Sequence, residues 1–273
     1  MKTVRRAARI VLVAGFVIAA LVAAAGPVSA QPAAVPRLAH VVVVVFENEE
    51  RGDVLGAGQA PTFDRLAGAY AQATDYRGVA HPSLPNYLAL ISGSTHGVTN
   101  DCTDCPQSGP TIGTELTRAG RTWAAYAEGY PSSPRFAKRH EPFLYFPDGA
   151  SHVHGLDALQ PSALPAFAFV TPDLCHDAHD CSLATADSWL KQFVSPLLRV
   201  PRTAVFIVFD EGTSDVGGGG VVPMIAAGTA VKPHARYTPT TNHYGLLRTI
   251  EDALGVPPLG AAAHARPLTG IWR

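Results

Sequence analysis

The sequence predicts an α/β protein built as three layers, α/β/α, with a mainly parallel sheet between two layers of helices. Three observations support this fold class: apolar runs suited to buried strands, amphipathic segments between them, and polar clusters directly after several runs. Strands that alternate with helices along a chain usually form a parallel sheet covered by helices on both faces. Strands of such a sheet are continuously apolar, because neither face of the sheet meets water.

Six segments have the composition of strands. The segment 38–46 contains five consecutive valines, and so apolar a run predicts a central strand that is buried on both faces. The other predicted strands are shorter, and the first of them is the least regular. They cover 73–80, 121–128, 165–171, 203–209 and 221–228.

Four segments have helical periodicity. In 61–72 the apolar side chains share one face, and Pro61 stands at the first position, where a backbone N–H is not needed. In 244–255 apolar residues recur at helical spacing until Gly255, which marks the end of the helix. The remaining predicted helices cover 86–93 and 186–199, the second up to its proline. The irregular segment 129–163 is expected to act as a lid or substrate loop.

The first thirty residues have the layout of a secretory signal peptide. A basic start is followed by the apolar run 10–25 and by the small residues Val28-Ser29-Ala30, which predicts cleavage after Ala30. The alternative is a retained membrane anchor, and Arg5-Arg6 leaves a twin-arginine export route open.

Three regions follow from this interpretation: a signal peptide at 1–30, a Pro/Ala linker at 31–37 and one domain at 38–273. A domain of this length can bury a core of its own. We expect the mature protein to be secreted or to stay in the periplasm or cell envelope. No segment after the leader is long and apolar enough for a membrane span, and no pattern specifies an oligomeric state.

The charge of the mature chain argues against nucleic acid as a partner. Removing the four basic leader residues from the 21 Lys and Arg leaves 17 against 22 Asp and Glu, which changes the formal charge from −1 to −5. Proteins bind nucleic acid by neutralising its phosphates with basic side chains. We therefore expect no nucleic-acid partner.

Four cysteines are present: Cys102, Cys105, Cys175 and Cys181. They allow three complete pairings, and in an exported protein two local disulfides are expected. The spacing of Cys102 and Cys105 is also that of half a zinc site, but the sequence has no second pair with this spacing.

Polar clusters follow predicted strands or precede predicted helices. The clusters are Glu47-Asn48, His81-Pro82-Ser83, the segment 172–180, Asp210-Glu211 and Asn242-His243. All carboxyl ends of a parallel sheet lie at one edge, so these distant segments can converge there. Each cluster alone is equally explained by a solvated strand end, a turn or a helix cap.

The chemistry of these clusters predicts a divalent cation as cofactor. Carboxylate, amide and imidazole groups suit a hard or borderline cation and do not select one metal. Two adjacent acids such as Asp210 and Glu211 repel each other when buried, unless a cation or a proton neutralises them.

Ser83 is the candidate nucleophile. It stands between prolines just before the predicted helix 86–93, and the N-terminus of a helix stabilises anions. A serine oxygen beside a metal can lose its proton and attack phosphorus. The chain has no Gly-x-Ser-x-Gly motif, which disfavours a serine hydrolase of the α/β type. The alternative is that Ser83 only caps the helix.

Ordered blocks of this sequence resemble the phosphoesterase family of bacterial acid phosphatases and phospholipases C, within the alkaline phosphatase-like superfamily. The resemblance covers most of the chain after the leader. Its blocks are HVVVVVFENEE, HPSLPNYLALISGSTHGVTNDC, YAEGYP, RHEPFLYF, PDLCHDAHDC, FIVFDEG and HYGLLRTIEDALG. The resemblance implies an alkaline phosphatase-like phosphoesterase domain at 38–273.

The resemblance also implies a metal centre. It places Glu47, Asn48, Asp210 and Glu211 around the cation, with Ser83 as the metal-bound nucleophile. The segment SLPNY is similar to the nucleophile segment of nucleotide pyrophosphatases, which supports the role of Ser83.

Further roles follow from the same resemblance. Asn100 stands where those enzymes carry an Asn that binds the substrate and stabilises the non-bridging oxygens. His140 is expected to contact the phosphate or the leaving group. His179 and His243 are expected to move protons, and His243 matches a late histidine of the superfamily's metal centre.

The number of metal ions stays open. Superfamily enzymes with two metals have an Asp followed four residues later by a His, whereas this chain has Asp173 and Asp177 at that spacing. Asp177 is the expected ligand, and His176 and His179 are other possible ligands of this segment.

Together these observations predict an exported, metal-dependent phosphoesterase with a serine nucleophile, most simply an acid phosphatase acting on small phosphate esters. A phospholipase C-type diesterase acting on a lipid phosphate ester is the alternative among enzymes. A protein that binds a phosphorylated ligand or a metal without turnover is the alternative from another class, but a pure binder does not need a nucleophile.

Overall fold

The structure is a computed structural model, and it describes residues 34–273. The predicted signal peptide at 1–30 and its cleavage after Ala30 lie outside the described residues, as does most of the linker at 31–37. Within residues 34–273 we find no helix with the length and apolarity that a membrane span requires.

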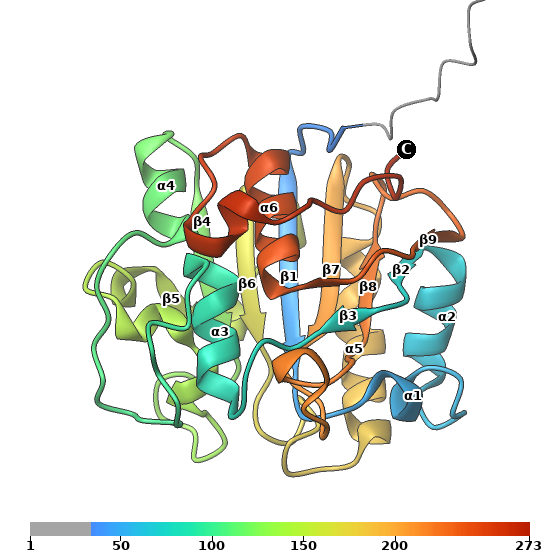
Figure 1. The fold of residues 1–273 in the computed structure, drawn as a ribbon, viewed down its shortest axis with the longest axis horizontal. Helices are drawn as coiled ribbons and strands as arrows, with labels where there is room; N and C mark the ends of the chain where they lie inside the picture. Colours follow the sequence, from blue (N-terminus) through green and yellow to red (C-terminus); the bar gives the residue numbers. More distant parts are fainter. Residues whose placement is uncertain (1–33) are drawn as a thin grey trace, which may run out of the picture. The chain divides into compact units, whose positions relative to one another are not determined.

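An eight-stranded sheet lies at the centre of the domain (Figure 1), in the order β5-β4-β6-β1-β7-β8-β2-β9. Neighbouring strands are parallel except at β8, which is antiparallel to both β7 and β2. Two further strands, β3 and β10, pair with each other outside this sheet. The strands are β1 (His40–Phe46), β2 (Ala71–Ala73), β3 (Tyr76–Arg77), β4 (Trp123–Ala127), β5 (Val153–Gly155), β6 (Phe167–Thr171), β7 (Thr203–Phe209), β8 (Met224–Ala227), β9 (Ala235–Tyr237) and β10 (Thr241–Asn242).

Helices cover both faces of this sheet. Figure 1 shows α6 in front of β1 and α5 behind β7 and β8; α3 packs on α6, and α2 packs on α5. The predicted three-layer α/β/α fold is therefore confirmed. The helices are α1 (Arg51–Val54), α2 (Pro61–Ala69), α3 (Ser83–Ser92), α4 (Ile112–Arg118), α5 (Leu183–Leu197) and α6 (His243–Leu254).

The central strands position the chemistry. Every residue of β1 from Val41 to Phe46 is at most 1% exposed, as expected for a strand with helices on both sides. Because β6, β1 and β7 are parallel neighbours, their carboxyl ends lie at one edge. In the register, Phe46 pairs with Phe209, so the residues that follow these two phenylalanines are brought side by side.

The predicted boundaries of the helices at 61–72 and 186–199 are wrong. The predicted helix at 61–72 ends at Ala69, because the next residues join the sheet as β2 between β8 and β9. The predicted helix at 186–199 begins earlier, after Ser182, whose side chain accepts a hydrogen bond from a backbone N–H of the first turn. It also continues past Pro196, which lies in the last turn, where the loss of one backbone hydrogen bond costs least.

The two local disulfides expected from the sequence are present. They join Cys102 to Cys105 and Cys175 to Cys181, so no cysteine of the described residues is left to bind zinc. The second disulfide closes the loop that follows β6.

The buried carboxyl of Glu141 makes stability depend on pH. Glu141 is fully buried, with one carboxyl oxygen accepting from the backbone N–H of Phe143 and the other without a hydrogen-bond partner. Burial raises the pKa of Glu141 from its ordinary value of 4.5 to about 8. Between these pH values the folded protein keeps a proton that the unfolded chain releases. The free energy of unfolding therefore falls as pH rises through this window.

The variant Glu141→Gln is expected to flatten this pH dependence, because its side chain is uncharged in both states. The decrease in the free energy of unfolding from pH 5 to pH 8 should be smaller than in the wild type by roughly 2 to 4 kcal/mol. Urea unfolding at the two pH values measures it, with the exposed Asp148→Asn as the control. An unchanged decrease in Glu141→Gln would show that Glu141 is not the titrating group.

Candidate active site

The carboxyl ends of three parallel strands meet at this site. Glu47 follows β1, Asp177 lies in the loop after β6, and Asp210 follows β7. The backbone N–H of Glu47 donates to the carbonyl of Asp177 (2.9 Å), and that of Asn48 donates to Asp210 Oδ1 (3.2 Å). The structure thus brings these predicted site residues together, as expected for residues at one edge of a parallel sheet.

Ser83 reaches this group from α3. The helix begins at Ser83 rather than at the predicted position 86, so the hydroxyl lies in its first turn and is 3% exposed. Ser83 Oγ donates to Glu47 Oε2 (2.9 Å) and lies 3.3 Å from Glu211 Oε1. The hydroxyl carries one proton, and the shorter contact identifies Glu47 as its acceptor.

Asn86 explains why the helix begins early. Its side-chain oxygen accepts from the backbone N–H groups of Val79 and Ala80, and its side-chain nitrogen donates to the carbonyls of Ala80 and Pro82. These bonds fix the segment that enters the helix, so Ser83 is held at a defined position.

Three carboxyls of this site are buried close together. Glu47 and Asp210 are fully buried, and Glu211 is 5% exposed. Burial, and then the charges of Asp210 and Asp177, raise the pKa of Glu47 well above its usual range. Burial, and then the charge of Glu211, do the same to the pKa of Asp210. No Lys or Arg of residues 34–273 forms an ion pair with these three carboxyls. Within that part of the chain, only histidines pair with them: His81 with Glu211 and His140 with Glu47.

The donor set fits a divalent cation. Asp210 Oδ2 is buried and has no hydrogen-bond partner within the described chain, although a buried carboxylate oxygen normally has one. Carboxylate oxygens of Glu47 and Glu211 both contact Ser83 Oγ, and the backbone N–H of Asn48 contacts Asp210 Oδ1. Oxygen donors of this kind suit a hard or borderline cation. The residues predicted from the sequence to bind metal are therefore chemically compatible with that role.

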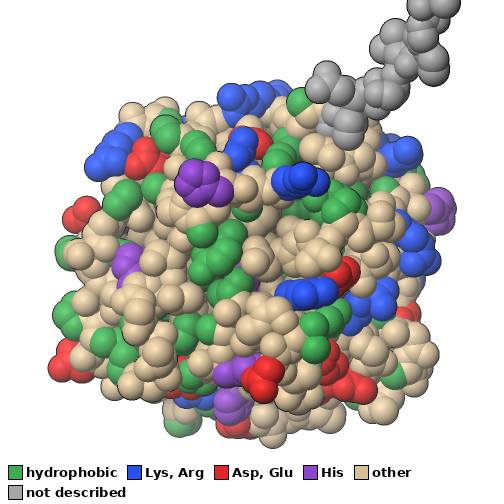
Figure 2. Space-filling model, viewed as in Figure 1, with side chains coloured by type: hydrophobic (Ala, Val, Ile, Leu, Met, Phe, Trp, Pro, Cys, Tyr) green, Lys and Arg blue, Asp and Glu red, His purple; other side chains and the backbone are tan. Residues whose placement is uncertain are grey.

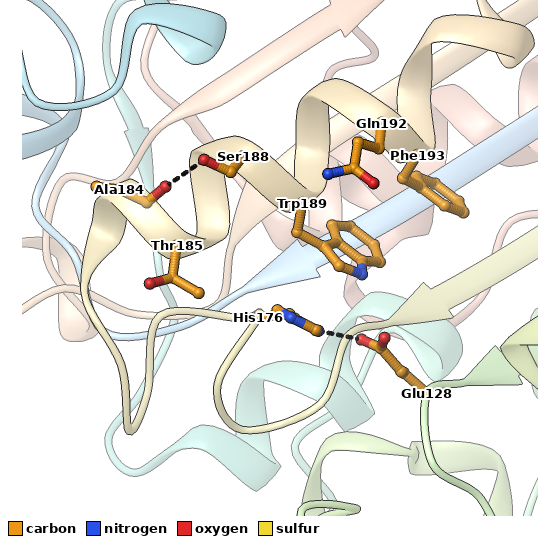
Figure 3. Close-up of a pocket in the computed structure, with 8 residues that line it drawn as sticks. All are labelled: Glu128, His176, Ala184, Thr185, Ser188, Trp189, Gln192 and Phe193. Atoms are coloured by element: carbon orange, nitrogen blue, oxygen red, sulfur yellow. Dashed lines mark hydrogen bonds and ion pairs between the residues drawn. The ribbon is translucent and has the colours of Figure 1, made fainter.

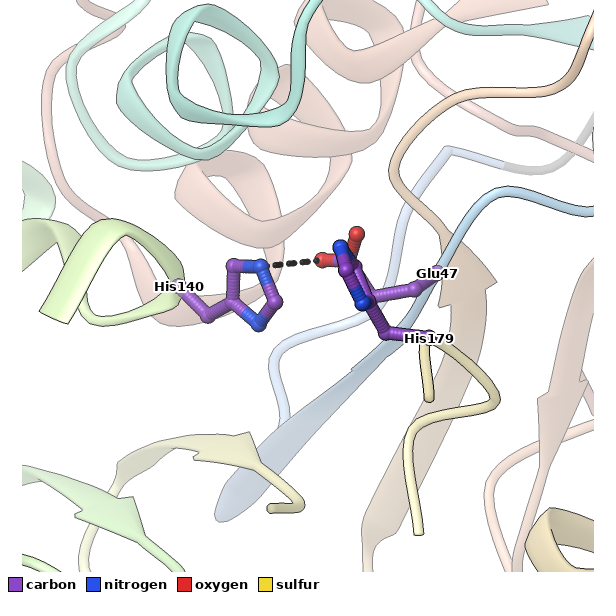
Figure 4. Close-up of side chains that lie close together, drawn as sticks. All are labelled: Glu47, His140 and His179. Atoms are coloured by element: carbon purple, nitrogen blue, oxygen red, sulfur yellow. Dashed lines mark ion pairs between the residues drawn. The ribbon is translucent and has the colours of Figure 1, made fainter. Parts of the chain in front are cut away.

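A second grouping overlaps the first. Ligand atoms of Glu47, His140 and His179 lie within 4.8 Å of one another (Figure 4). His179, however, is exposed, and its ring nitrogens already lie 2.6 Å from Asp180 Oδ1 and 3.1 Å from Arg139 Nη2. We favour the carboxylate group around Asp210 as the metal site. Asp210 Oδ2 has no hydrogen-bond partner within the described chain, so no hydrogen bond has to break when this oxygen binds a cation.

His140 and Tyr87 support Glu47 from inside the protein. The Tyr87 hydroxyl donates to Glu47 Oε1 (2.5 Å), and its ring stacks on His140 at 5.3 Å between centroids. His140 Nδ1 lies 3.1 Å from Asp177 Oδ2, and Nε2 lies 3.3 Å from Glu47 Oε1 without hydrogen-bond geometry. Burial lowers the pKa of His140 well below its usual range, which favours the neutral imidazole.

The sequence analysis did not identify Tyr87. The available signal was its spacing, because Tyr87 follows Ser83 by four residues and so shares its face of a helix.

His81 and Glu50 hold the loop after Asp210 and were also missed. His81 Nδ1 contacts Glu211 Oε2, and its Nε2 lies 3.1 Å from the carbonyl of Ser214. Three backbone N–H groups of the segment 213–221 donate to the Glu50 carboxylate. Both residues stand in motifs that the sequence analysis singled out for their neighbours, and only the folded loop shows their contacts.

The structure does not bring Asn100 to this group. Asn100 is exposed, and its side-chain oxygen accepts from the backbone N–H of Cys102 (3.1 Å). Asp101 instead reaches α3, where its carboxylate accepts from the backbone N–H of Leu84 (3.0 Å). One of the helix N-terminal groups expected to stabilise phosphate therefore already has a partner.

His243 lies behind Asp210 rather than beside Ser83. It is fully buried, with Nε2 2.6 Å from the carbonyl of Asp210 and Nδ1 2.7 Å from the Tyr76 hydroxyl. Burial lowers the pKa of His243 to about 4. Both ring nitrogens are thus occupied, so the expected proton transfer by His243 has no support in this geometry, and its contacts position Asp210.

Two acidic residues of the loop after β6, Asp173 and Asp177, have different surroundings. Asp177 joins the site, accepting from the backbone N–H of His179 and contacting His140, and burial raises its pKa to about 7. Asp173 instead accepts from backbone N–H groups within its own loop and lies 3.5 Å from His176. The four-residue spacing therefore places only Asp177 in the group.

Known proteins resemble this chain over most of its length. Residues 54–257 match the model of the Phosphoesterase family. Phosphatidylinositol-3-phosphatase of Mycobacterium tuberculosis is 33% identical over 286 residues, covering 98% of this chain and 94% of the relative. The phosphate-repressible acid phosphatase of Penicillium chrysogenum is 28% identical over 241 residues, covering 77% of this chain and 58% of the relative. The chain thus spans little more than half the length of that fungal protein.

A solved structure supports the fold alone. A protein of the alkaline phosphatase superfamily from Vibrio parahaemolyticus superposes with a TM-score of 0.65 at 11% identity, covering 87% of this chain and 71% of that chain. The match agrees with the three-layer arrangement of sheet and helices.

Proposed function

The chain belongs to the phosphoesterase family and is a hydrolase of phosphoric ester bonds, and on this premise we propose that it is an exported, metal-dependent phosphatase with Ser83 as its nucleophile. The observation that carries the proposal is the position of Ser83 Oγ, 2.9 Å from one buried carboxylate and 3.3 Å from another. The signal-peptide layout and the two disulfides support export.

The proposed metal centre uses the donor set described above. Glu47, Asn48, Asp210 and Glu211 would hold a divalent cation, which would polarise the phosphoryl group and lower the pKa of the Ser83 hydroxyl. The buried, unpartnered Asp210 Oδ2 supports this assignment.

Glu47 and water carry the proton transfers. As Ser83 Oγ bonds to phosphorus and the ester P–O bond breaks, the proton of Ser83 passes to Glu47 Oε2, and the leaving oxygen takes a proton from water and departs as the alcohol. The hydroxide that remains attacks the phosphoserine, the Oγ–P bond breaks, phosphate departs, and the proton held by Glu47 returns to Ser83 Oγ. His140 Nε2 lacks a hydrogen-bond partner within the described residues, and it donates to a phosphate oxygen only when the imidazole is protonated, because Nδ1 already faces the Asp177 carboxylate. His179 is exposed at the rim and is placed to exchange protons with solvent.

Trapping the covalent intermediate tests the proposal. Turnover of a ³²P-labelled phosphomonoester is quenched in acid, and the protein is digested and mapped. We expect label on the peptide that contains Ser83, formed with a divalent metal and absent after chelation. Metal-dependent release of phosphate with no label on the protein would contradict the serine mechanism.

A phosphomonoester is the proposed substrate class. Both named relatives are phosphatases, and one is named for a monoester on an inositol lipid. We therefore place a phospholipase C-type diesterase second. Phosphate release from monoesters without phosphocholine release from phosphatidylcholine is the expected pattern, and the reverse would favour the diesterase.

The variant Tyr87→Phe is expected to bind metal more weakly. It removes the hydroxyl that fixes Glu47 Oε1 but keeps the ring stacked on His140. Groups that orient metal ligands typically contribute about 10- to 100-fold in affinity. Equilibrium dialysis with Mn²⁺ or Zn²⁺ should show this loss, while a large excess of metal restores most of kcat.

Tyr126→Phe is the matched control, since Tyr126 is a mostly buried tyrosine of β4. Its metal affinity should equal that of the wild type. Equal affinity in Tyr87→Phe and the wild type would show that the hydroxyl does not orient a metal ligand.

A further inference from the structure

A cavity of about 760 Å³ lies beside α5, near the catalytic edge (Figure 3). Glu128, the first residue after β4, and His176, in the loop after β6, form one part of its lining. Side chains of α5, including Trp189, Gln192 and Phe193, form the other. The mechanism above uses none of these residues.

Three stacked rings form an aromatic wall in this cavity. Trp189 and Phe193 lie one helical turn apart on α5, with ring centroids 4.8 Å apart and planes 10° apart. The imidazole of His176 also lies near Trp189, with 6.2 Å between ring centroids and 24° between ring planes. All three side chains are partly exposed, so parts of these rings remain accessible to a ligand.

The cavity adjoins the metal-binding residues through shared backbone. His176 lines the cavity, whereas its neighbour Asp177 contacts His140 in the active site. The ring of Trp189 packs edge-on against Phe46, which directly precedes Glu47. The disulfide between Cys175 and Cys181 closes the loop that carries both His176 and Asp177. A substrate bound at the edge of this loop can contact the cavity and the active site.

The lining does not suit the phosphate itself. No Lys or Arg of the described residues lines the cavity, and Glu128 brings a carboxylate. Glu128 Oε2 is bonded to His176 Nδ1 (2.9 Å) and to a backbone N–H. No side chain of residues 34–273 bonds to Glu128 Oε1, His176 Nε2 or the Gln192 amide. An aromatic wall with such free polar groups suits a neutral ring that carries hydroxyl groups.

We propose that this cavity, the ring subsite, binds the alcohol part of the substrate, and that this alcohol is a hydroxylated ring such as a sugar or a cyclitol. The proposal rests on the proposed phosphatase function. The C–H face of the ring packs on Trp189 and Phe193, and its hydroxyls bond to Glu128, His176 and Gln192.

Comparing a ring phosphate with an acyclic phosphate tests the ring subsite. Wild type and Trp189→Ala are assayed with glucose 6-phosphate and with glycerol 3-phosphate at saturating metal. We expect KM for glucose 6-phosphate to rise about 10-fold in Trp189→Ala, with kcat nearly unchanged and with both constants for glycerol 3-phosphate unchanged. An unchanged KM for glucose 6-phosphate overturns the proposal, and so does an equal rise for both substrates.

A second variant guards against loss of folding. Gln192 is exposed, so Gln192→Ala is expected to fold and to raise KM for glucose 6-phosphate about threefold. Lys191→Ala is the control, because Lys191 is an exposed residue of α5 outside this cavity. If Gln192→Ala and Lys191→Ala have the same KM for glucose 6-phosphate, Gln192 does not bind a hydroxyl of the substrate and the proposal fails.

The failure of this proposal is distinct from failure of the proposed function. Hydrolysis of glycerol 3-phosphate and labelling of Ser83 report on the nucleophile, whereas the ratio of the two KM values reports on the ring subsite. Normal Ser83 labelling with an unchanged ratio in Trp189→Ala overturns only the subsite.

Discussion

Replacing Ser83 with alanine is expected to lower kcat for a phosphomonoester by at least about 1,000-fold, as losses of catalytic nucleophiles in hydrolases do. The structural reason is that no other hydroxyl occupies the position between Glu47 Oε2 and Glu211 Oε1. The side chain is small and lies at the start of α3, so the melting temperature should change little. Phosphate release and circular dichroism measure the two effects.

Ser92→Ala is the matched control. Ser92 is also a buried serine of α3, but its hydroxyl donates to the carbonyl of Leu88 at the other end of the helix. We expect kcat of Ser92→Ala within about threefold of the wild type, even if its melting temperature falls. Near-normal activity in Ser83→Ala would remove Ser83 from the reaction.

Replacing Asp210 with asparagine is expected to have opposite effects on the metal-free and metal-loaded protein. Without metal, the change relieves repulsion between Asp210 and its buried neighbours Glu47 and Glu211, so the melting temperature should rise. With metal, the wild type should gain stability, because the cation binds only the folded state. The variant should lose most of this gain, with affinity lower by at least about 100-fold and no measurable turnover.

Asp187→Asn separates this effect from a general loss of a buried acid. Asp187 is 5% exposed and accepts from the backbone N–H groups of Thr62 and Phe63 at the start of α2. We expect Asp187→Asn to melt at a lower temperature but to keep the full stabilisation by metal. The melting temperature of each variant is measured with chelator and with Mn²⁺. If Mn²⁺ raises the melting temperature of Asp210→Asn as much as that of the wild type, Asp210 is not a metal ligand.

The fold was predictable because the apolar composition of single strands and the order of strands and helices along the chain both indicate a parallel α/β sheet. The valine run of β1 is typical of a strand buried on both faces, and the alternation of strands and helices predicted the parallel sheet and its two helical layers. The boundary near 61–72 was not predictable. Its sequence also suits a helix, and only pairing with β8 and β9 places residues 71–73 in the sheet.

Convergence of the site was predictable for residues that directly follow strands. Glu47 and Asp210 must meet because β1 and β7 are parallel neighbours. Asn100 lies in a loop, and His243 follows β10, which is outside the central sheet. Loop geometry and burial therefore decide the contacts of these two residues. The spacing of Tyr87 from Ser83 indicates only a shared helix face, and the hydrogen bond from Tyr87 to Glu47 depends on how α3 packs against β1.

The complete burial of α3 has a consequence for how the protein loses activity on heating. All ten residues of the helix that carries Ser83 are buried, so this helix belongs to the part of the chain that opens only when the whole domain opens. The position of the Ser83 hydroxyl is therefore independent of motions in the surface loops. Heat should abolish catalysis and the fold in one event, and an enzyme that has cooled and refolded should recover its reactive hydroxyl in the original position.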